Sequence, residues 1–551
     1  MRRAPGIYVS TLVVLLLLCS AATFSQQSAQ LSSQKGAQRE FGEVSFMNSG
    51  PAAAQADFLH GLAQLHNFEY EDAAEHFRKA QQTAPDFALA YWGEALTQNH
   101  PVWHEEDVAA AREILKRLGP TPEARLAKAP TEREKLYLRS VEMLFGEGTK
   151  EERDRRYEAV LAELHRKFPD DVDGAAFEAL AILGTAEKGR DFATYMRAAA
   201  ILEEVFPQHP RHPGVVHYLI HCYDDSVHAP LGLRAARIYS KIAPEAGHAQ
   251  HMTSHIFLSL GMWDDEVKAN ETAMAVVNKE REKAGKPHAM CGHYNEWLEY
   301  GYLQQGRTAD ARRVLEGCRG AAEKAAAAAA DPKNPAHVGM SGMSMNGMSP
   351  AMGAVDSYAG MRAHFLIATQ QWNDEVARWT MPPGDYPFGE GSFDYTNAIA
   401  AIHRGDLAAA REAIARVEKD GPRCIALMEK MGAMDGHEVV DIYNGELHAI
   451  LAAAEGKTTE AVTELRQMAE KEHKMPLEFG PPSIEKPTDE LLGELLLQLH
   501  RPAEAREAFV TALSRTPGRT IVVEALARSD KEIAAMPLAK QTAAAKPAQN
   551  H

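Results

Sequence analysis

A turn followed by a helix with small or apolar residues about four positions apart recurs along the chain. The pattern appears, among other places, at residues 260–270, 305–315, 370–379, 404–414, 455–465 and 500–517. Alanine is abundant in such stretches and runs of β-branched residues are scarce, so helices are predicted rather than strands. Because 551 residues are too many for one hydrophobic core, we expect an all-α chain built as several domains or as a repeat array.

The clearest unit is residues 55–87, QADFLHGLAQLHNFEYEDAAEHFRKAQQTAPDF, which resembles the tetratricopeptide repeat, a helix–turn–helix unit of 34 residues. Weaker copies follow at 87–97, 157–171 and 196–210. The resemblance implies an α-solenoid, a right-handed superhelix of about nine or ten helical hairpins over most of residues 51–530. Six positions agree with the repeat consensus in one register: Gly61, Tyr70, Ala73, Phe77, Ala80 and Pro85.

The start of the chain has the pattern of an export signal. Arg2 and Arg3 precede a short apolar run at 11–18, and small residues follow at 20–22. The run is too short for a comfortable membrane span, and no later segment is apolar enough to cross a bilayer. We therefore expect a periplasmic or secreted protein with no membrane span in its mature chain.

Composition and repeats together divide the chain into seven segments. The expected segments are a signal peptide at 1–25, a flexible leader at 26–50, repeat units at 51–118, a repeat array with a histidine-rich groove at 119–318, an Ala-rich then Met/Gly/Ser-rich insertion at 319–354, a second array at 355–537 and a disordered tail at 538–551.

The net charge and the cysteine spacing argue against two kinds of site, a nucleic-acid-binding surface and a cysteine-based zinc site. The formal net charge is −17, so a surface that neutralises nucleic-acid phosphates is not expected. Four cysteines remain beyond the signal segment, and none belongs to a C-x-x-C pair of the kind that binds zinc. Cys291 and Cys318 could form a disulfide across one helical hairpin, or they could be free buried thiols.

Histidine is the compositional exception, with 24 copies, and its positions follow the repeat. His217 and His221 form an i, i+4 pair, and His251 and His255 form a second, so each pair lies on one helix face. The two pairs are 34 residues apart, which is the repeat period. Neither pair has a glutamate after its first histidine, so the H-E-x-x-H metalloprotease motif is absent.

In the tetratricopeptide family, positions 2, 5, 9, 12 and 13 of the first helix line the concave groove. The resemblance therefore implies that other residues at these positions face the same inner surface as the histidine pairs. The nearest of them are His248, His293, Asp224 and Glu296. Groove positions farther along the array are held by His66, Asn99, His100, Tyr300, His364, Glu490 and Glu494.

Metal ligation suits this set of side chains. His217, His221, His251 and His255 are the expected ligands of one ion or two, with His248, His293, Asp224 and Glu296 as further ligands or as groups that orient the imidazoles. Imidazoles with carboxylates favour Zn or Cu over Fe or Mn. Two alternatives remain open: a groove that binds a peptide or partner protein, and histidines with a structural or pH-sensing role.

The segments HPGVVHYLIHCYDD and HAQHMTSHIFLSLGMW resemble a family of exported bacterial tetratricopeptide proteins, and the agreement covers most of the mature chain. The resemblance singles out His100 beside the two histidine pairs and His293, and it implies no reaction. The chain departs from that family at His364, where an arginine is usual.

A methionine-rich stretch, MSGMSMNGMSPAM, lies at 340–352. Spaced thioethers in a polar loop can bind Cu(I), so Met340, Met343, Met345 and Met348 form a candidate copper loop, or else a low-complexity insertion without a ligand. No nucleophile motif, phosphate loop or dinucleotide fingerprint accompanies the histidines. Whether the protein is an enzyme stays open, with metal-assisted hydrolysis and copper redox chemistry as the two reaction classes that fit the ligands.

Overall fold

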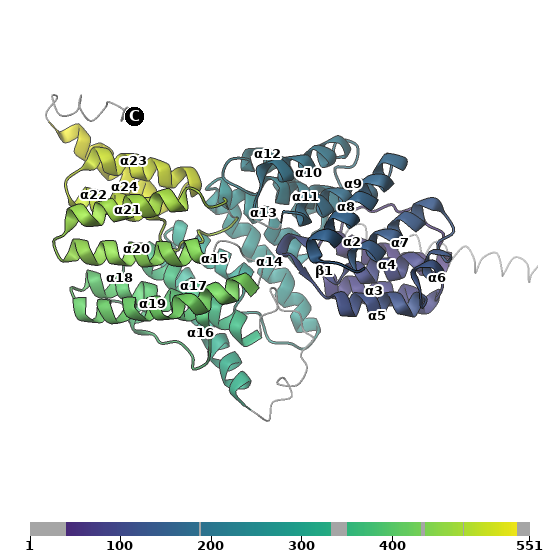
Figure 1. Cartoon of the computed structure of the whole chain (residues 1–551), viewed down its shortest axis with the longest axis horizontal. Helices are drawn as coiled ribbons and strands as arrows, with labels where there is room; N and C mark the ends of the chain where they lie inside the picture. The colour runs from purple at the N-terminus through teal and green to yellow at the C-terminus, as the bar shows by residue number, and fades with distance from the viewer. Residues whose placement is uncertain (1–39, 187–188, 332–349, 431–435, 478, 537–551) are drawn as a thin grey trace, which may run out of the picture.

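The computed structural model describes residues 40–186, 189–331, 350–430, 436–477 and 479–536. Over these residues the chain is an all-α solenoid, which confirms the predicted fold class (Figure 1). Ten antiparallel helical hairpins follow one another in the described part, at the upper end of the expected number. They are α2–α3, α4–α5, α7–α8, α9–α10, α11–α12, α13–α14, α15–α16, α18–α19, α20–α21 and α22–α23.

The first half of the chain carries the helices that hold the histidine pairs. Its elements are α2 (Ala52–His66), α3 (Tyr70–Thr83), α4 (Ala88–Leu96), β1 (Asn99–His100), η1 (Pro101–Trp103), β2 (Glu105–Glu106), α5 (Val108–Leu118), α6 (Pro122–Leu126), α7 (Glu132–Leu144), α8 (Lys150–Lys167), α9 (Val172–Gly184), α10 (Phe192–Val205), α11 (Pro213–Tyr223), α12 (Ala229–Ile242), α13 (Gly247–Ser259) and α14 (Trp263–Lys283).

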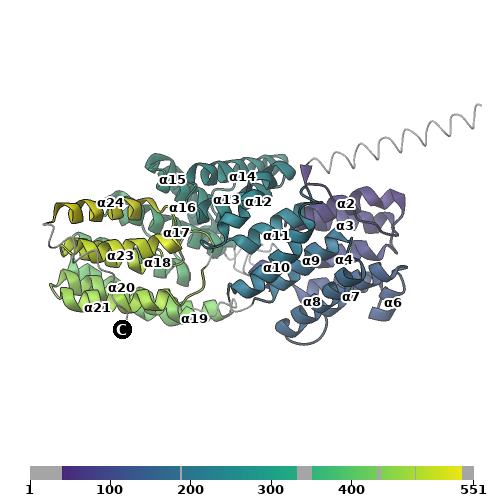
Figure 2. The same ribbon diagram turned by 90° about the horizontal axis from the view of Figure 1, so that it is seen from above.

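The second half continues the array in the same manner. Its elements are α15 (His293–Gln304), α16 (Thr308–Ala330), α17 (Pro350–Thr369), η4 (Glu375–Arg378), α18 (Pro387–His403), α19 (Leu407–Lys430), α20 (Gly436–Ala454), α21 (Thr458–Glu472), α22 (Thr488–Gln498), α23 (Pro502–Arg515) and α24 (Thr520–Ala535). Figure 2 shows α2–α11 at one end of the molecule and α18–α24 at the other, with α13–α17 between them. No helix in the described ranges is both long and apolar enough to span a membrane.

Turns near the C-terminus contact the middle of the array. The indole of Trp263, at the start of α14, donates a 2.8 Å hydrogen bond to the carbonyl oxygen of Gly518. Gly261 has a φ of +66°, and a Cβ there would lie 2.8 Å from the carbonyl oxygen of Pro517, so this contact requires glycine. Arg519 is buried and donates to the hydroxyl of Tyr300 on α15 at 2.9 Å. The array is therefore braced across its middle by its own C-terminal turns.

Residues 370–379 differ from the prediction of a turn and a helix, because only the short 3-10 helix η4 forms there. Pro382 and Pro383 follow closely and cannot donate backbone hydrogen bonds to an extended helix. The buried guanidinium of Arg362 donates hydrogen bonds to the carbonyl oxygens of Val376 and Ala377, both at 3.0 Å. The side chain of Arg362 on α17 thus supplies the hydrogen bonds that a further helical turn would give to these carbonyl groups.

The described part of the predicted leader also differs from a flexible segment. Val44 and Phe46 are buried, and the ring of Phe46 lies 5.0 Å from that of Tyr137 and 5.5 Å from that of Phe58. The two apolar side chains fix residues 40–50 as a strap across the first hairpins. The rest of the leader, the signal segment and the tail at 538–551 lie outside the described residues.

The predicted insertion at 319–354 is helical where it is described. The Ala-rich run extends α16 to Ala330, as the high helix propensity of alanine favours, and α17 begins at Pro350. The four methionines of the candidate copper loop lie outside the described residues. Cys291 and Cys318 form a disulfide and are not free thiols. The bond joins Cys291, before α15, to Cys318 within α16.

Candidate metal centre

The histidine pairs lie on α11 and α13, the first helices of two successive hairpins, which pack against each other. Pro213 occupies the first turn of α11, and the ring of His212 caps it by accepting a hydrogen bond from the amide of Val215 at 3.3 Å. Every residue of α13 is buried, so its polar side chains need partners inside the protein. The array therefore presents the histidines to neighbouring helices and not to an open groove.

Three histidines form the first cluster, which we define as His217, His221 and His248. The Nε2 atom of His217 lies 3.1 Å from Nε2 of His221 and 3.2 Å from Nε2 of His248. His248 reaches this cluster from the beginning of α13, while the other two come from α11. One ligand atom from each residue lies within 4.8 Å of the others.

Three more form the second cluster, which we define as His251, His255 and His293. The Nε2 atoms of His251 and His255 lie 3.0 Å apart on α13, and His293 joins them from the first residue of α15. Their ligand atoms again lie within 4.8 Å of one another. The structure thus separates the four expected ligands into two pairs and gives each pair a third imidazole from the following hairpin.

Acceptors engage the other ring nitrogen of three of these six histidines. His217 Nδ1 donates to the backbone carbonyl oxygen of His66 at 2.7 Å. His251 Nδ1 donates to Oδ1 of Asn270 at 2.6 Å, and His255 Nδ1 donates to Asp224 Oδ2 at 2.5 Å. When Nδ1 carries the proton of a neutral imidazole, Nε2 is left with a lone pair. In their neutral forms, His217, His251 and His255 therefore each present a lone pair on Nε2.

This arrangement matches the geometry of metal ligands. Two imidazole nitrogens bound to one tetrahedral ion at about 2.0–2.1 Å lie roughly 3.3–3.4 Å apart. The observed separation of 3.0 Å between His251 and His255 is close to that value, and a cation between them would remove the repulsion of two lone pairs. Acceptors on Nδ1 are the usual outer partners of metal-bound histidines.

Burial favours the neutral form of five of these six imidazoles. Desolvation, together with the nearby His255, lowers the pKa of His217 and that of His293 to about 3. Burial likewise lowers the pKa of His221, His248 and His251 well below the usual value. Neutral imidazole is the form that binds metal ions.

Aromatic rings enclose both clusters. Phe68, whose φ is +58°, places its ring 4.4 Å from that of His217 and 5.4 Å from that of His248. The Trp297 ring lies 4.2 Å from that of His255. Such walls exclude water and lower the local dielectric around a bound ion.

A third group, His66, His212 and Asp173, has similar composition but different chemistry. His66 Nε2 and His212 Nε2 both approach Asp173 Oδ1, at 2.9 and 3.2 Å. Because Nδ1 of His212 accepts the amide of Val215, its Nε2 carries a proton and donates it to the carboxylate. The phenol of Tyr218 lies 3.0 Å from the remaining nitrogen of His66. The polar atoms of these three residues are paired by hydrogen bonds within the protein, so we assign the group a structural role.

The remaining predicted groove residues lie apart from the two clusters. Burial raises the pKa of the Glu296 carboxyl, which hydrogen bonds with Ser357. His364 Nδ1 lies 3.8 Å from the buried carboxylate of Glu299. Tyr300, Glu490 and Glu494 belong to a buried ionic network with Lys486 and Arg519. Asn99 and His100 form strand β1.

Sequence reasoning missed the groups that orient the rings, apart from Asp224. Asn270 lies on α14, 19 residues beyond its histidine, and its own amide nitrogen donates to Glu266 Oε1 at 2.6 Å. The residue type alone carries no signal for this role. Phe68 and Trp297 are also invisible to a search for ligands, because aromatic residues at such positions are common in any helical core.

No protein-family model and no curated protein sequence matches the chain. Among solved structures it is similar to one from the crystal structure of the APC/C hetero-tetramer Cut9-Hcn1, with 12% identity, 91% of this chain and 81% of that chain covered and a TM-score of 0.34. It is also similar to the human IFIT1 dimer with m7Gppp-AAAA, at 12% identity, 92% and 94% coverage and a TM-score of 0.31. Yeast Tom70 gives 12% identity, 90% and 99% coverage and a TM-score of 0.31. Likeness at this level carries no argument about function.

Proposed function

We propose that this chain is an exported metal-binding solenoid in which each histidine cluster holds one transition-metal ion. The observation that carries the proposal is the pair His251 and His255, whose Nε2 atoms lie 3.0 Å apart in a buried site while acceptors hold both Nδ1 atoms. Two lone pairs at that distance need a cation between them. In the first cluster, one hairpin earlier, the Nε2 atom of His217 lies 3.1 Å from that of His221 and 3.2 Å from that of His248, and its Nδ1 is held by the carbonyl oxygen of His66.

Zinc and copper are the ions that the donor set favours. Three neutral imidazoles suit Zn and Cu, and no thiolate or thioether belongs to either cluster. Three protein ligands would leave a coordination position for water or a substrate, which is the arrangement of catalytic rather than structural zinc sites. The residues of each cluster bind and orient the ion, and the carboxylate of Asp224 orients the ring of His255.

A peptide groove is the alternative with less support from the geometry. Recognition of an extended peptide needs accessible side chains, but His217 and His251 are 0% exposed. Their hydrogen bonds run to groups of this chain and leave Nε2 atoms facing each other. The scaffold itself, a solenoid of helical hairpins, is compatible with a partner protein on other faces.

Elemental analysis of the purified mature protein tests the proposal. We expect two ions per chain in the wild type and one in each of the variants His217→Ala and His251→Ala. The control is His448→Ala, whose side chain is 47% exposed and lies on α20, and it should keep both ions. Metal content near zero in the wild type after incubation with Zn or Cu would overturn the proposal.

A further inference from the structure

A small hairpin between α4 and α5 concentrates buried polar atoms that have no hydrogen-bond partner. It consists of β1, η1 and β2, and its tip residue His104 has a φ of +55°. Of the sixteen such atoms in the described part of the chain, six belong to this hairpin and to the adjoining Tyr70. They are Tyr70 Oη, Asn99 Oδ1, His100 Nε2, His104 Nδ1, Glu105 Oε1 and Glu106 Oε2. Buried polar groups normally have partners, so this concentration indicates a ligand.

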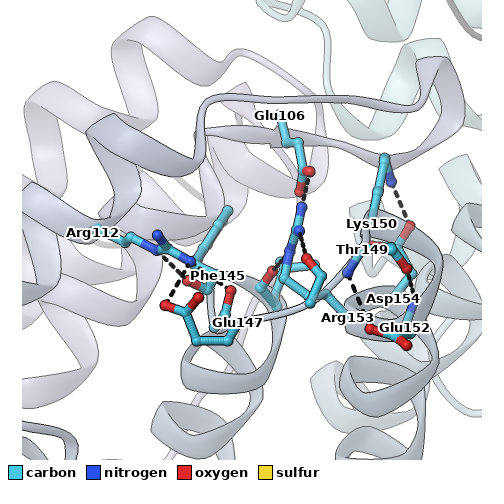
Figure 3. Close-up of polar contacts among 12 residues, drawn as sticks. Glu106, Arg112, Phe145, Glu147, Thr149, Lys150, Glu152, Arg153 and Asp154 are labelled. Carbon is cyan, nitrogen blue, oxygen red and sulfur yellow. Dashed lines mark hydrogen bonds and ion pairs between the residues drawn. The ribbon is translucent and has the colours of Figure 1, made fainter.

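One face of the hairpin is fixed by α8. The buried guanidinium of Arg153 pairs with Glu106 and also donates to the carbonyl oxygens of Leu144, at 2.9 Å, and Gly148, at 2.7 Å (Figure 3). Neighbouring residues of a strand point to opposite faces. With Glu106 held against α8, Glu105 therefore points the other way, and so does His100, which is paired with it across the ladder.

The opposite face forms a polar site against Tyr70, which we call the hairpin site and define as Tyr70, His100 and Glu105. The rings of Tyr70 and His100 stack with centroids 4.1 Å apart. His100 Nδ1 lies 3.4 Å from Glu105 Oε2 and donates to it, which leaves a lone pair on Nε2. Glu105 Oε1 is a second acceptor without a partner, and His100 is 8% exposed.

Aromatic side chains connect the hairpin site to the first cluster. The Phe68 ring lies 5.3 Å from that of Tyr70 and 5.4 Å from that of His248. Trp103 of the same hairpin is 6.3 Å from His100 and 6.1 Å from His248, again between ring centroids. A ligand held at the hairpin site would therefore extend along aromatic surface toward the proposed metal ion.

Unpaired acceptors beside aromatic faces are the chemistry that binds an organic cation. We propose that the hairpin site binds the ammonium or guanidinium group of a small basic molecule and places that molecule beside the first cluster. The location next to the metal rests on the proposed function, but recognition of the cation by Tyr70, His100 and Glu105 does not. The substrate class of the metal centre is then a basic organic compound.

Calorimetric titration of the full mature protein tests this inference, with n-butylguanidinium, n-butylammonium and neutral n-butylurea as probes. The variants are Glu105→Gln, which keeps the shape and removes the charge, and Tyr70→Phe. The matched control is Glu113→Gln, at an exposed position on α5. Far-UV circular dichroism and thermal melting verify that each variant is folded.

We expect at least one of the two cations to bind the wild type at least tenfold more tightly than n-butylurea. Glu105→Gln should weaken binding of that cation about tenfold or more, Tyr70→Phe should weaken it several-fold, and Glu113→Gln should leave it unchanged. The inference would be overturned if neither cation bound, or if the cations bound no more tightly than n-butylurea. It would also be overturned if Glu105→Gln bound the cation as tightly as the wild type. The same titration on chelator-treated protein separates the two proposals, because the cation should still bind when no metal is present.

Discussion

His251 and His255 face each other across one turn of α13 with their Nε2 atoms 3.0 Å apart, and an acceptor lies against the Nδ1 atom of each ring. The proton of each ring lies on Nδ1, held by Asn270 in one case and by Asp224 in the other. A pair of buried lone pairs at this distance is unfavourable unless a cation lies between them. The acceptors on Nδ1 thus determine which chemistry the facing nitrogens can perform.

The role of Asn270 as an orienting group is open to a direct test. Asn270→Ala removes the acceptor for His251 Nδ1 and should weaken metal binding at the second cluster about 10–100-fold. Competition against a chelator of known affinity measures the change. Lys268→Ala, at an exposed position on the same helix, is the control and should bind as the wild type does. Equal affinity in both variants would mean that Asn270 does not orient the ligand.

The group of His66, His212 and Asp173 should behave as a structural unit. Asp173→Asn replaces a carboxylate that accepts from both histidines with a neutral amide, so thermal stability should decrease. The metal content per folded chain should stay at that of the wild type. Loss of one ion in Asp173→Asn, with the melting temperature unchanged, would show that this group is itself a ligand set.

The disulfide ends two residues before His293 and ties the start of α15 to α16. Because the preceding residues 282–288 are exposed, this bond is the nearest covalent constraint on that ligand. The double variant Cys291→Ser/Cys318→Ser should therefore lower metal affinity at the second cluster and leave the first unchanged.

Chelator competition on single-cluster proteins resolves the two sites. His251→Ala reports the first cluster and His217→Ala the second, each with and without the disulfide. An equal effect of the cysteine changes on both clusters would point to general destabilisation in place of a local constraint.

Acid should destabilise the protein partly through His364. Burial, with Arg519 nearby, lowers the pKa of His364 to about 3, whereas an unfolded histidine titrates near 6.5. Between these values the unfolded chain binds the extra proton, so stability is lost as the pH falls from 6.5 toward 3.

At pH 4.5 this contribution amounts to about 2–3 kcal/mol. His364→Gln should reduce the loss of unfolding free energy between pH 7 and pH 4.5 by that amount, as measured by urea denaturation. His448→Gln, at an exposed site, should leave the loss unchanged. A pH dependence of His364→Gln identical to that of the wild type would contradict this assignment.

The repeat period and the helix faces could be predicted from the sequence, but the grouping of the ligands could not. The spacing of 34 residues predicts that His217 and His251 occupy equivalent positions, and they do. It does not reveal that His248 reaches back to α11 while His251, one turn later, joins the next cluster. That division depends on how successive helices cross, which periodicity does not specify.

Packing also shows what lies at the position equivalent to His248 one repeat earlier. Gly214 is the residue 34 positions before His248, and a Cβ there would lie 2.2 Å from Nδ1 of His66. The imidazole of His66 therefore fills the space that a side chain at this position would need. The hairpin at 99–106 was missed for a related cause, since two-residue strands carry no periodic signal.

X-ray absorption spectroscopy at the metal edge of the purified protein tests directly whether the two histidine clusters hold metal ions. Ions held by the two clusters should show nitrogen or oxygen neighbours at about 2.0–2.1 Å, with the outer-shell scattering of about three imidazoles per ion. At equal protein concentration the edge signal should fall to half in each of the single variants His217→Ala and His251→Ala, and it should vanish in the double variant. Sulfur scattering near 2.3 Å, or an edge signal that survives the double variant, would contradict the proposal.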